Sequence, residues 1–146
     1  MINFLLKNPS LYRFYQKTVR TKYDEYDFFK FIFKKNNFKN IRMLDICCGD
    51  SHILEHINEF IEDYLGLDNN DKYLKQCKDR WKNFNFVNLD LNDTKNINGL
   101  LNFKPNFIFI NGAIHHLDDK TMKSINSFIT NNFPESYFLS VDPIKN

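Results

Sequence analysis

Apolar residues along this chain alternate between short, nearly continuous runs and longer stretches with helical spacing. Runs of four to six mostly apolar residues are typical of buried strands, and apolar positions three or four apart are typical of helices. The first predicted strand opens the stretch Arg42–Ser51; the others are Asp63–Asp68, Asn85–Asp90, Asn106–Asn111 and Tyr137–Val141. Helices are predicted between them, over residues 53–61, 70–81, 94–102 and from Asp118 or Asp119 to about 131.

This alternation predicts the fold class. Strands that alternate with helices form parallel sheets with right-handed crossovers. We therefore expect an α/β fold of the Rossmann-like, doubly wound type, with a mostly parallel sheet.

Two further helices are predicted before the first strand, over residues 10–21 and 24–36. The second carries an aromatic face, Phe28 to Phe33, which we interpret as core. Helices in this position can also cover a ligand at the open end of a sheet. We expect residues 1–40 to form an amino-terminal helical lid or arm, and residues 41–146 to form the Rossmann-like domain within one structural unit.

The turn after the first strand, R-M-L-D-I-C-C-G-D-S, indicates what the domain binds. Cys47 and Ser51 stand where a dinucleotide-binding turn has its outer glycines, and only Gly49 remains. Asp45 and Asp50 would repel a diphosphate. The turn is better suited to a ligand with a positive, amino-acid-like end.

Three successive predicted strands carry an aspartate at or near their carboxyl ends: Asp45, Asp68 and Asp90. A carboxylate at the tip of the second strand can accept hydrogen bonds from both ribose hydroxyls. An acid at the tip of the third can accept one from the exocyclic amine of a purine. Helix capping is the alternative role, but three matching positions favour ligand binding.

Together these segments resemble the class I S-adenosylmethionine-dependent methyltransferases. The similarity runs through M-L-D-I-C-C-G-D-S, Y-L-G-L-D-N-N-D-K-Y-L, F-V-N-L-D-L-N-D, F-I-F-I-N-G-A-I-H-H-L-D-D and F-L-S-V-D-P, and L-Y-R-F-Y-Q resembles the amino-terminal helix of some bacterial members. The resemblance implies S-adenosyl-L-methionine as cofactor and S-adenosyl-L-homocysteine as product. The cofactor-binding residues that it implies are Tyr12, Gln16, Asp45, Cys47, Gly49, Asp68, Asn69, Asp90, Leu91, Asn111 and Gly112.

The sequence departs from that family at its carboxyl end. The family's sixth and seventh strands are missing after the fifth predicted strand. An uncovered sheet edge recruits other strands. We therefore expect a homo-oligomer, or a partner chain that covers this edge.

The four histidines form two pairs. His115 and His116 follow the fourth predicted strand and are the candidate catalytic residues, since a histidine can take a proton from the methyl acceptor. The alternative is that H-H-L-D-D orders the turn and caps the next helix. His52 and His56 lie one helical turn apart, but no third ligand of suitable spacing is evident, so we expect no metal site.

Charge leaves the acceptor open. Residues 1–42 hold 10 Lys/Arg and 3 Asp/Glu, whereas the net charge of the whole chain is +2. A basic arm can attract nucleic acid. We favour a methyltransferase, or its cofactor-binding part, that acts on a small molecule. The alternatives are an RNA methyltransferase that uses the basic arm and a non-catalytic, S-adenosylmethionine-binding or partner subunit. No apolar run suits a membrane span, and three cysteines form no disulfide framework, so we expect a cytoplasmic protein.

Overall fold

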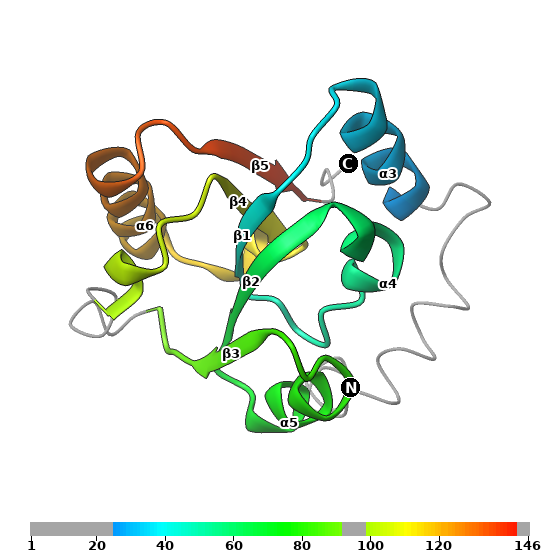
Figure 1. Cartoon of the computed structure of the whole chain (residues 1–146). Coiled ribbons are helices and arrows are strands. Elements are labelled where there is room, and N and C mark those ends of the chain that lie inside the picture. Colours follow the sequence, from blue (N-terminus) through cyan, green and yellow to red (C-terminus); the bar gives the residue numbers. More distant parts are fainter. Residues whose placement is uncertain (1–24, 92–98, 143–146) are drawn as a thin grey trace.

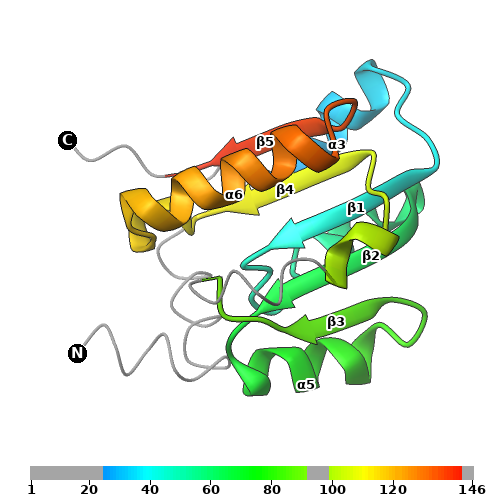
Figure 2. The same cartoon turned by 90° about the vertical axis from the view of Figure 1, so that its left-hand side faces the viewer.

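The computed structural model describes residues 25–91 and 99–142, and five parallel strands form a single sheet at its centre. The strands are β1 (Ile41–Ile46), β2 (Ile61–Asp68), β3 (Asn85–Asn88), β4 (Phe107–Asn111) and β5 (Tyr137–Val141). They lie side by side in the order β3-β2-β1-β4-β5 (Figure 2). This order confirms the doubly wound, parallel fold that the strand–helix alternation predicts.

Helices cover both faces of the sheet (Figure 1). On one face lie α3 (Glu25–Lys35), α4 (Leu54–Ile57) and α5 (Asp71–Arg80), and α6 (Asp119–Asn132) lies on the other. The strands are apolar on both sides, so each face buries its own hydrophobic cluster. This three-layer arrangement is what nearly continuous apolar strands require.

Helix α3 is anchored in the core. Phe29 and Phe33 are both 1% exposed, and their rings pack edge-on against Phe109 and Phe107 with centroids 5.3 and 5.1 Å apart. The interpretation of this aromatic face as core is therefore confirmed for these two residues. It is wrong for Phe28, which is 58% exposed. The helix predicted over residues 10–21 lies outside the described residues, and the lid stays a prediction.

The helix between β1 and β2 is shorter than the apolar spacing predicts. Helix α4 ends at Ile57, a 3-10 turn covers Asn58–Phe60, and Ile61 already begins β2. Its apolar side chains, Leu54 and Ile57, are completely buried. The apolar spacing that continues through Phe60 and Ile61 thus comes from a helix, a 3-10 turn and a strand in succession, and not from one continuous helix.

Other boundaries are close to the predictions. Helix α5 begins after Asn70, whose side chain accepts a hydrogen bond from the Lys72 amide, and α6 begins after Asp118, whose side chain accepts one from the Thr121 amide. Strand β5 has the predicted bounds. Strand β3, however, ends at Asn88, so the prediction that it reaches Asp90 is wrong.

Strand β5 is the last strand on its side of the described sheet and pairs there with β4. Its Tyr137 and Phe138 are 62% and 46% exposed. The partner expected at this edge stays a prediction. Among the described residues, no helix is both long enough and apolar enough to span a bilayer.

Candidate functional site

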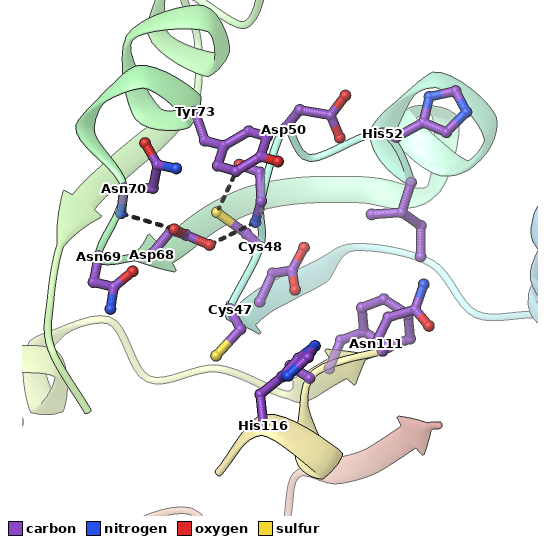
Figure 3. Close-up of a pocket in the computed structure, with 16 residues that line it drawn as sticks. Cys47, Cys48, Asp50, His52, Asp68, Asn69, Asn70, Tyr73, Asn111 and His116 are labelled. Atoms are coloured by element: carbon purple, nitrogen blue, oxygen red, sulfur yellow. Dashed lines mark hydrogen bonds between the residues drawn. The ribbon is translucent and has the colours of Figure 1, made fainter. Parts of the chain in front are cut away.

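A cavity of about 290 Å³ opens at the carboxyl ends of β1, β2 and β4 (Figure 3). This is the position where parallel α/β sheets bind ligands, because neighbouring strands there connect in opposite directions. The structure brings together eight of the residues predicted from sequence. They are Asp45, Cys47, Gly49, Asp68, Asn69, Asn111, Gly112 and His116.

Several lining residues were not among the predicted site residues. Tyr73 comes from the first turn of α5, and its side chain lies over the turn after β1 (Figure 3). Tyr73 lies three residues after Asn70, which caps α5. Because helical side chains tilt towards the amino terminus of the helix, the Tyr73 side chain is directed back towards the strand ends. The other additions are Cys48, Asp50, His52, Ile53, Asn70, Phe109 and Ala113.

The turn after β1 keeps a glycine-like backbone although only one of its three left-handed residues is glycine. Cys47, Gly49 and Ser51 have φ angles of 60°, 54° and 51°, in the left-handed region. Such a conformation is costly for residues other than glycine. Buried contacts hold it, since the Ser51 hydroxyl lies 3.0 Å from the Tyr64 hydroxyl and 3.5 Å from the Cys77 sulfur. The substitutions therefore preserve the shape of the turn.

Asp68, at the tip of β2, connects two turns. Its Oδ2 accepts a hydrogen bond from the Gly49 amide and its Oδ1 accepts one from the Asn70 amide, both at 2.9 Å. Each carboxylate oxygen keeps a second lone pair for a ligand. Burial raises the pKa of Asp68, and the amide hydrogen bonds oppose that shift. The carboxylate is thus fixed in place at the cavity wall.

Asp45 lies deeper, with 3% of its surface exposed. Its Oδ2 accepts a hydrogen bond from the Tyr64 hydroxyl. Burial raises its pKa from the usual 3.8 to about 7; the Tyr64 hydrogen bond lowers the pKa, and the nearby charge of Asp68 raises it further. Near neutral pH, a cationic ligand group at this position would draw the carboxyl towards its charged form.

The cysteines of the turn are not activated thiols. All three cysteines are free, and burial, followed by the charges of Asp68 and Asp45, raises the pKa of Cys47 to about 12. The pKa of Cys48 is also raised, by a hydrogen bond with Cys77 and by burial. A thiol with a raised pKa is a poor nucleophile. The two cysteines of the turn are therefore better explained as small side chains that fill a tight turn.

The two histidines after β4 have different surroundings. His116 lines the cavity, whereas His115 is not among its lining residues. The amide and the Nδ1 of His115 each lie 2.8 Å from an oxygen of Asp142, directly after β5. His115 therefore ties the turn after β4 to the end of β5, and Asp118 caps α6, as the alternative interpretation of H-H-L-D-D predicts.

Besides His115, four predicted cofactor-binding residues are not placed in the cavity. Asp90 is exposed, two residues beyond the end of β3, and does not line the cavity. Leu91 is buried in the hydrophobic cluster on the α6 face. Their contact with adenine stays a prediction. Tyr12 and Gln16 lie outside the described residues.

The family is shown by its sequence model. Residues 37–145 match the model described as "Methyltransferase domain". This match covers most of the chain, and together with the five-stranded fold it places the chain in the S-adenosylmethionine-dependent methyltransferase family. Members of this family use S-adenosylmethionine. The comparison with curated proteins found no match.

Solved structures agree on the fold. One is an S-adenosylmethionine-dependent methyltransferase from Clostridium acetobutylicum, with a TM-score of 0.69, 17% identity and coverage of 90% of this chain and 55% of that one. A TehB-like methyltransferase from Corynebacterium glutamicum has a TM-score of 0.64 and 15% identity, with coverage of 88% and 67%.

A third similar structure is S-adenosylmethionine-bound CalS10, an amino pentose methyltransferase from Micromonospora echinaspora. Its TM-score is 0.60 and its identity 15%, with coverage of 82% of this chain and 49% of that one. The chain therefore spans about half the length of several structures that it resembles. At these identities the comparison shows the fold alone.

Proposed function

We propose that this chain binds S-adenosylmethionine in the cavity and supports methyl transfer to a small-molecule acceptor. The observation that carries the proposal is Asp68. Its carboxylate lies at the tip of β2, held by amides of the turn after β1 and the turn after β2. That is the position from which an acid can bind both ribose hydroxyls of an adenosine.

The charge of the cavity supports a cationic ligand. Asp45, Asp50 and Asp68 line it, and none of its described lining residues is Lys or Arg. A diphosphate would meet carboxylates here without a compensating cation. A ligand that carries an ammonium and a sulfonium would find complementary charge. This favours S-adenosylmethionine over NAD.

When bound, S-adenosylmethionine supplies a methyl group on a positively charged sulfur. The residues of this chain would mainly contribute position, because methyl transfer requires the acceptor in line with the sulfur–methyl bond. Asn111, Gly112 and Ala113 line the side of the cavity after β4. His116 stands beside them and can accept a proton from a hydroxyl or ammonium acceptor.

The test is methyl transfer from S-adenosylmethionine to mixtures of small amines, alcohols and phenols, beside total RNA. We expect product among the small molecules, and we expect the Asp68→Ala chain to form much less of it. Methylation of RNA alone would favour the alternative that uses the basic arm. Binding of S-adenosylhomocysteine without any transfer would favour the non-catalytic alternative.

A further inference from the structure

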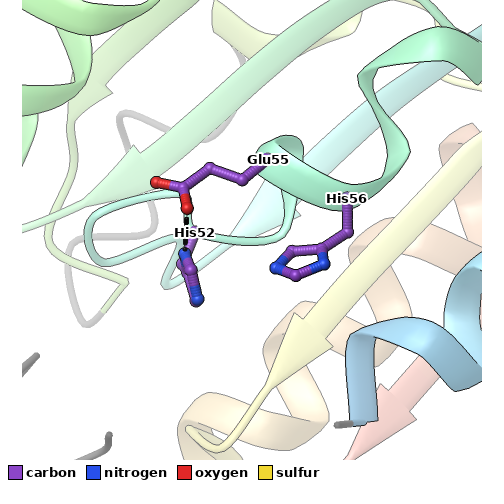
Figure 4. Close-up of side chains that lie close together, drawn as sticks. All are labelled: His52, Glu55 and His56. Atoms are coloured by element: carbon purple, nitrogen blue, oxygen red, sulfur yellow. Dashed lines mark ion pairs between the residues drawn. The ribbon is translucent and has the colours of Figure 1, made fainter.

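A cluster of possible metal ligands lies beside the cavity and shares only His52 with its lining. His52, Glu55 and His56 each offer one ligand atom, and these three atoms all lie within 4.8 Å of one another (Figure 4). The expectation that the two histidines lack a third ligand is wrong, because the pattern H-x-x-E-H contains Glu55 between them. We propose that these three residues bind one divalent transition-metal ion of the zinc type.

The backbone explains why the three side chains converge. His52 lies in the turn two residues before the start of the short helix α4, and Glu55 and His56 lie on the helix. Residues separated by three and four positions share one face of helical backbone. Two histidines four residues apart are the spacing that helical zinc sites use. The cluster is therefore a consequence of local structure and needs no distant segment.

The contacts are close to those of a metal site. His52 Nδ1 lies 3.0 Å from Glu55 Oε2, and the His52 and His56 rings lie 5.2 Å apart, nearly perpendicular. Ligands about 2.0–2.1 Å from a tetrahedral zinc ion lie roughly 3.3 Å from one another. The separation of 3.0 Å between His52 Nδ1 and Glu55 Oε2 is already close to this value. A metal ion would bind between these two atoms, and a rotation of the His56 side chain would complete the set.

The ligand chemistry selects the class of metal. Two imidazoles and one carboxylate suit zinc, cobalt or nickel better than calcium or magnesium, which prefer oxygen ligands. Three protein ligands leave a fourth position open. His52 also lines the cofactor cavity, so the ion would lie next to the turn that contains Gly49 and Asp50.

A second contact orients the Glu55 carboxylate. Arg80, at the end of α5, places its Nη1 2.8 Å from Glu55 Oε1. This leaves Oε2 directed at His52. Hydrogen bonds from outer residues commonly orient the carboxylates that bind metals. Arg80 is thus a positioning residue for the proposed site.

The test is a calorimetric titration of the full chain with zinc chloride, repeated with cobalt chloride. We expect one ion per chain. We expect His56→Ala and Glu55→Gln each to weaken binding by more than about tenfold, since even outer partners of metal ligands change affinity by about 10–100-fold. Zinc should also raise the melting temperature of the unmodified chain, and less so that of the variants.

The matched control is the other histidine pair. A chain with His115→Ala and His116→Ala loses two imidazoles, one more than His56→Ala, and should still bind zinc as tightly as the unmodified chain. Circular dichroism establishes that each variant is folded, and Glu55→Gln keeps the shape of the side chain if His56→Ala is unstable. The proposal is overturned if the unmodified chain binds no zinc, if both cluster variants bind it unchanged, or if only the control loses it.

Discussion

At pH 8, replacing Asp45 with asparagine is expected to stabilise the ligand-free chain by about 4 kcal/mol. The cause is burial, which raises the pKa of Asp45 from 3.8 to about 7. Between those two values the folded chain binds a proton that the unfolded chain has released. The contribution of the protonated Asp45 carboxyl to the free energy of unfolding is therefore fully present below about pH 4. It is lost as the pH rises through about 7, by about 1.4 kcal/mol per pH unit. Asparagine is neutral throughout and escapes this loss.

Urea unfolding of both chains between pH 4 and pH 8 measures this effect. The difference in unfolding free energy between the variant and the unmodified chain should grow with pH and level off above about pH 7. Asp79→Asn, on the exposed face of α5, removes the same charge outside the cavity and should show no such growth. A difference that is constant across this range would contradict the buried, proton-holding role of Asp45.

Removing the carboxylate of Asp68 is expected to weaken binding of S-adenosylhomocysteine by about 2–3 kcal/mol, or roughly 30–150-fold. This is the scale of losing charge-assisted hydrogen bonds to two hydroxyls. Asp68→Ala also removes the acceptor for the Gly49 and Asn70 amides, so the turns on either side lose their connection. Calorimetric titration of the variant measures the affinity directly.

Two further variants separate these contributions. Asp68→Asn keeps an accepting oxygen for one amide but removes the charge, so it should fold more stably than Asp68→Ala and still bind weakly. Asp79→Ala is the matched control for loss of an acid and should bind like the unmodified chain. If Asp68→Ala melts and binds like the unmodified chain, Asp68 does not hold the ribose.

The fold could be predicted from sequence because its signals are local. Each strand is a short apolar run, and the intervening stretches carry caps such as Asn70 and Asp118 that fix where helices begin. The prediction was wrong where two elements join without a break. Ile61 continues the spacing of α4 but is paired with Ile41 as the start of β2.

The residues of the candidate site also divide into those with a local sequence signal and those whose contacts depend on the fold. Asp45, Gly49 and Asp68 could be predicted because they lie close to the carboxyl ends of buried strands, and these ends meet at one edge of a parallel sheet. Contacts between distant segments gave no sequence signal. The link from His115 to Asp142 depends on β4 and β5 being neighbours, and the support of Ser51 by Tyr64 and Cys77 depends on packing. The pattern H-x-x-E-H is visible in the sequence, but the short distance from Glu55 to His52 depends on the turn before α4.

The most direct test of the central claim is calorimetric titration of the unmodified chain with S-adenosylhomocysteine and, separately, with NAD. Both ligands contain an adenosine whose ribose can meet Asp68, so they differ mainly in what the turn after β1 must accept. The acidic cavity predicts that S-adenosylhomocysteine binds at one site and more tightly than NAD. Tighter binding of NAD, or no binding of S-adenosylhomocysteine, would contradict the assignment of this cavity.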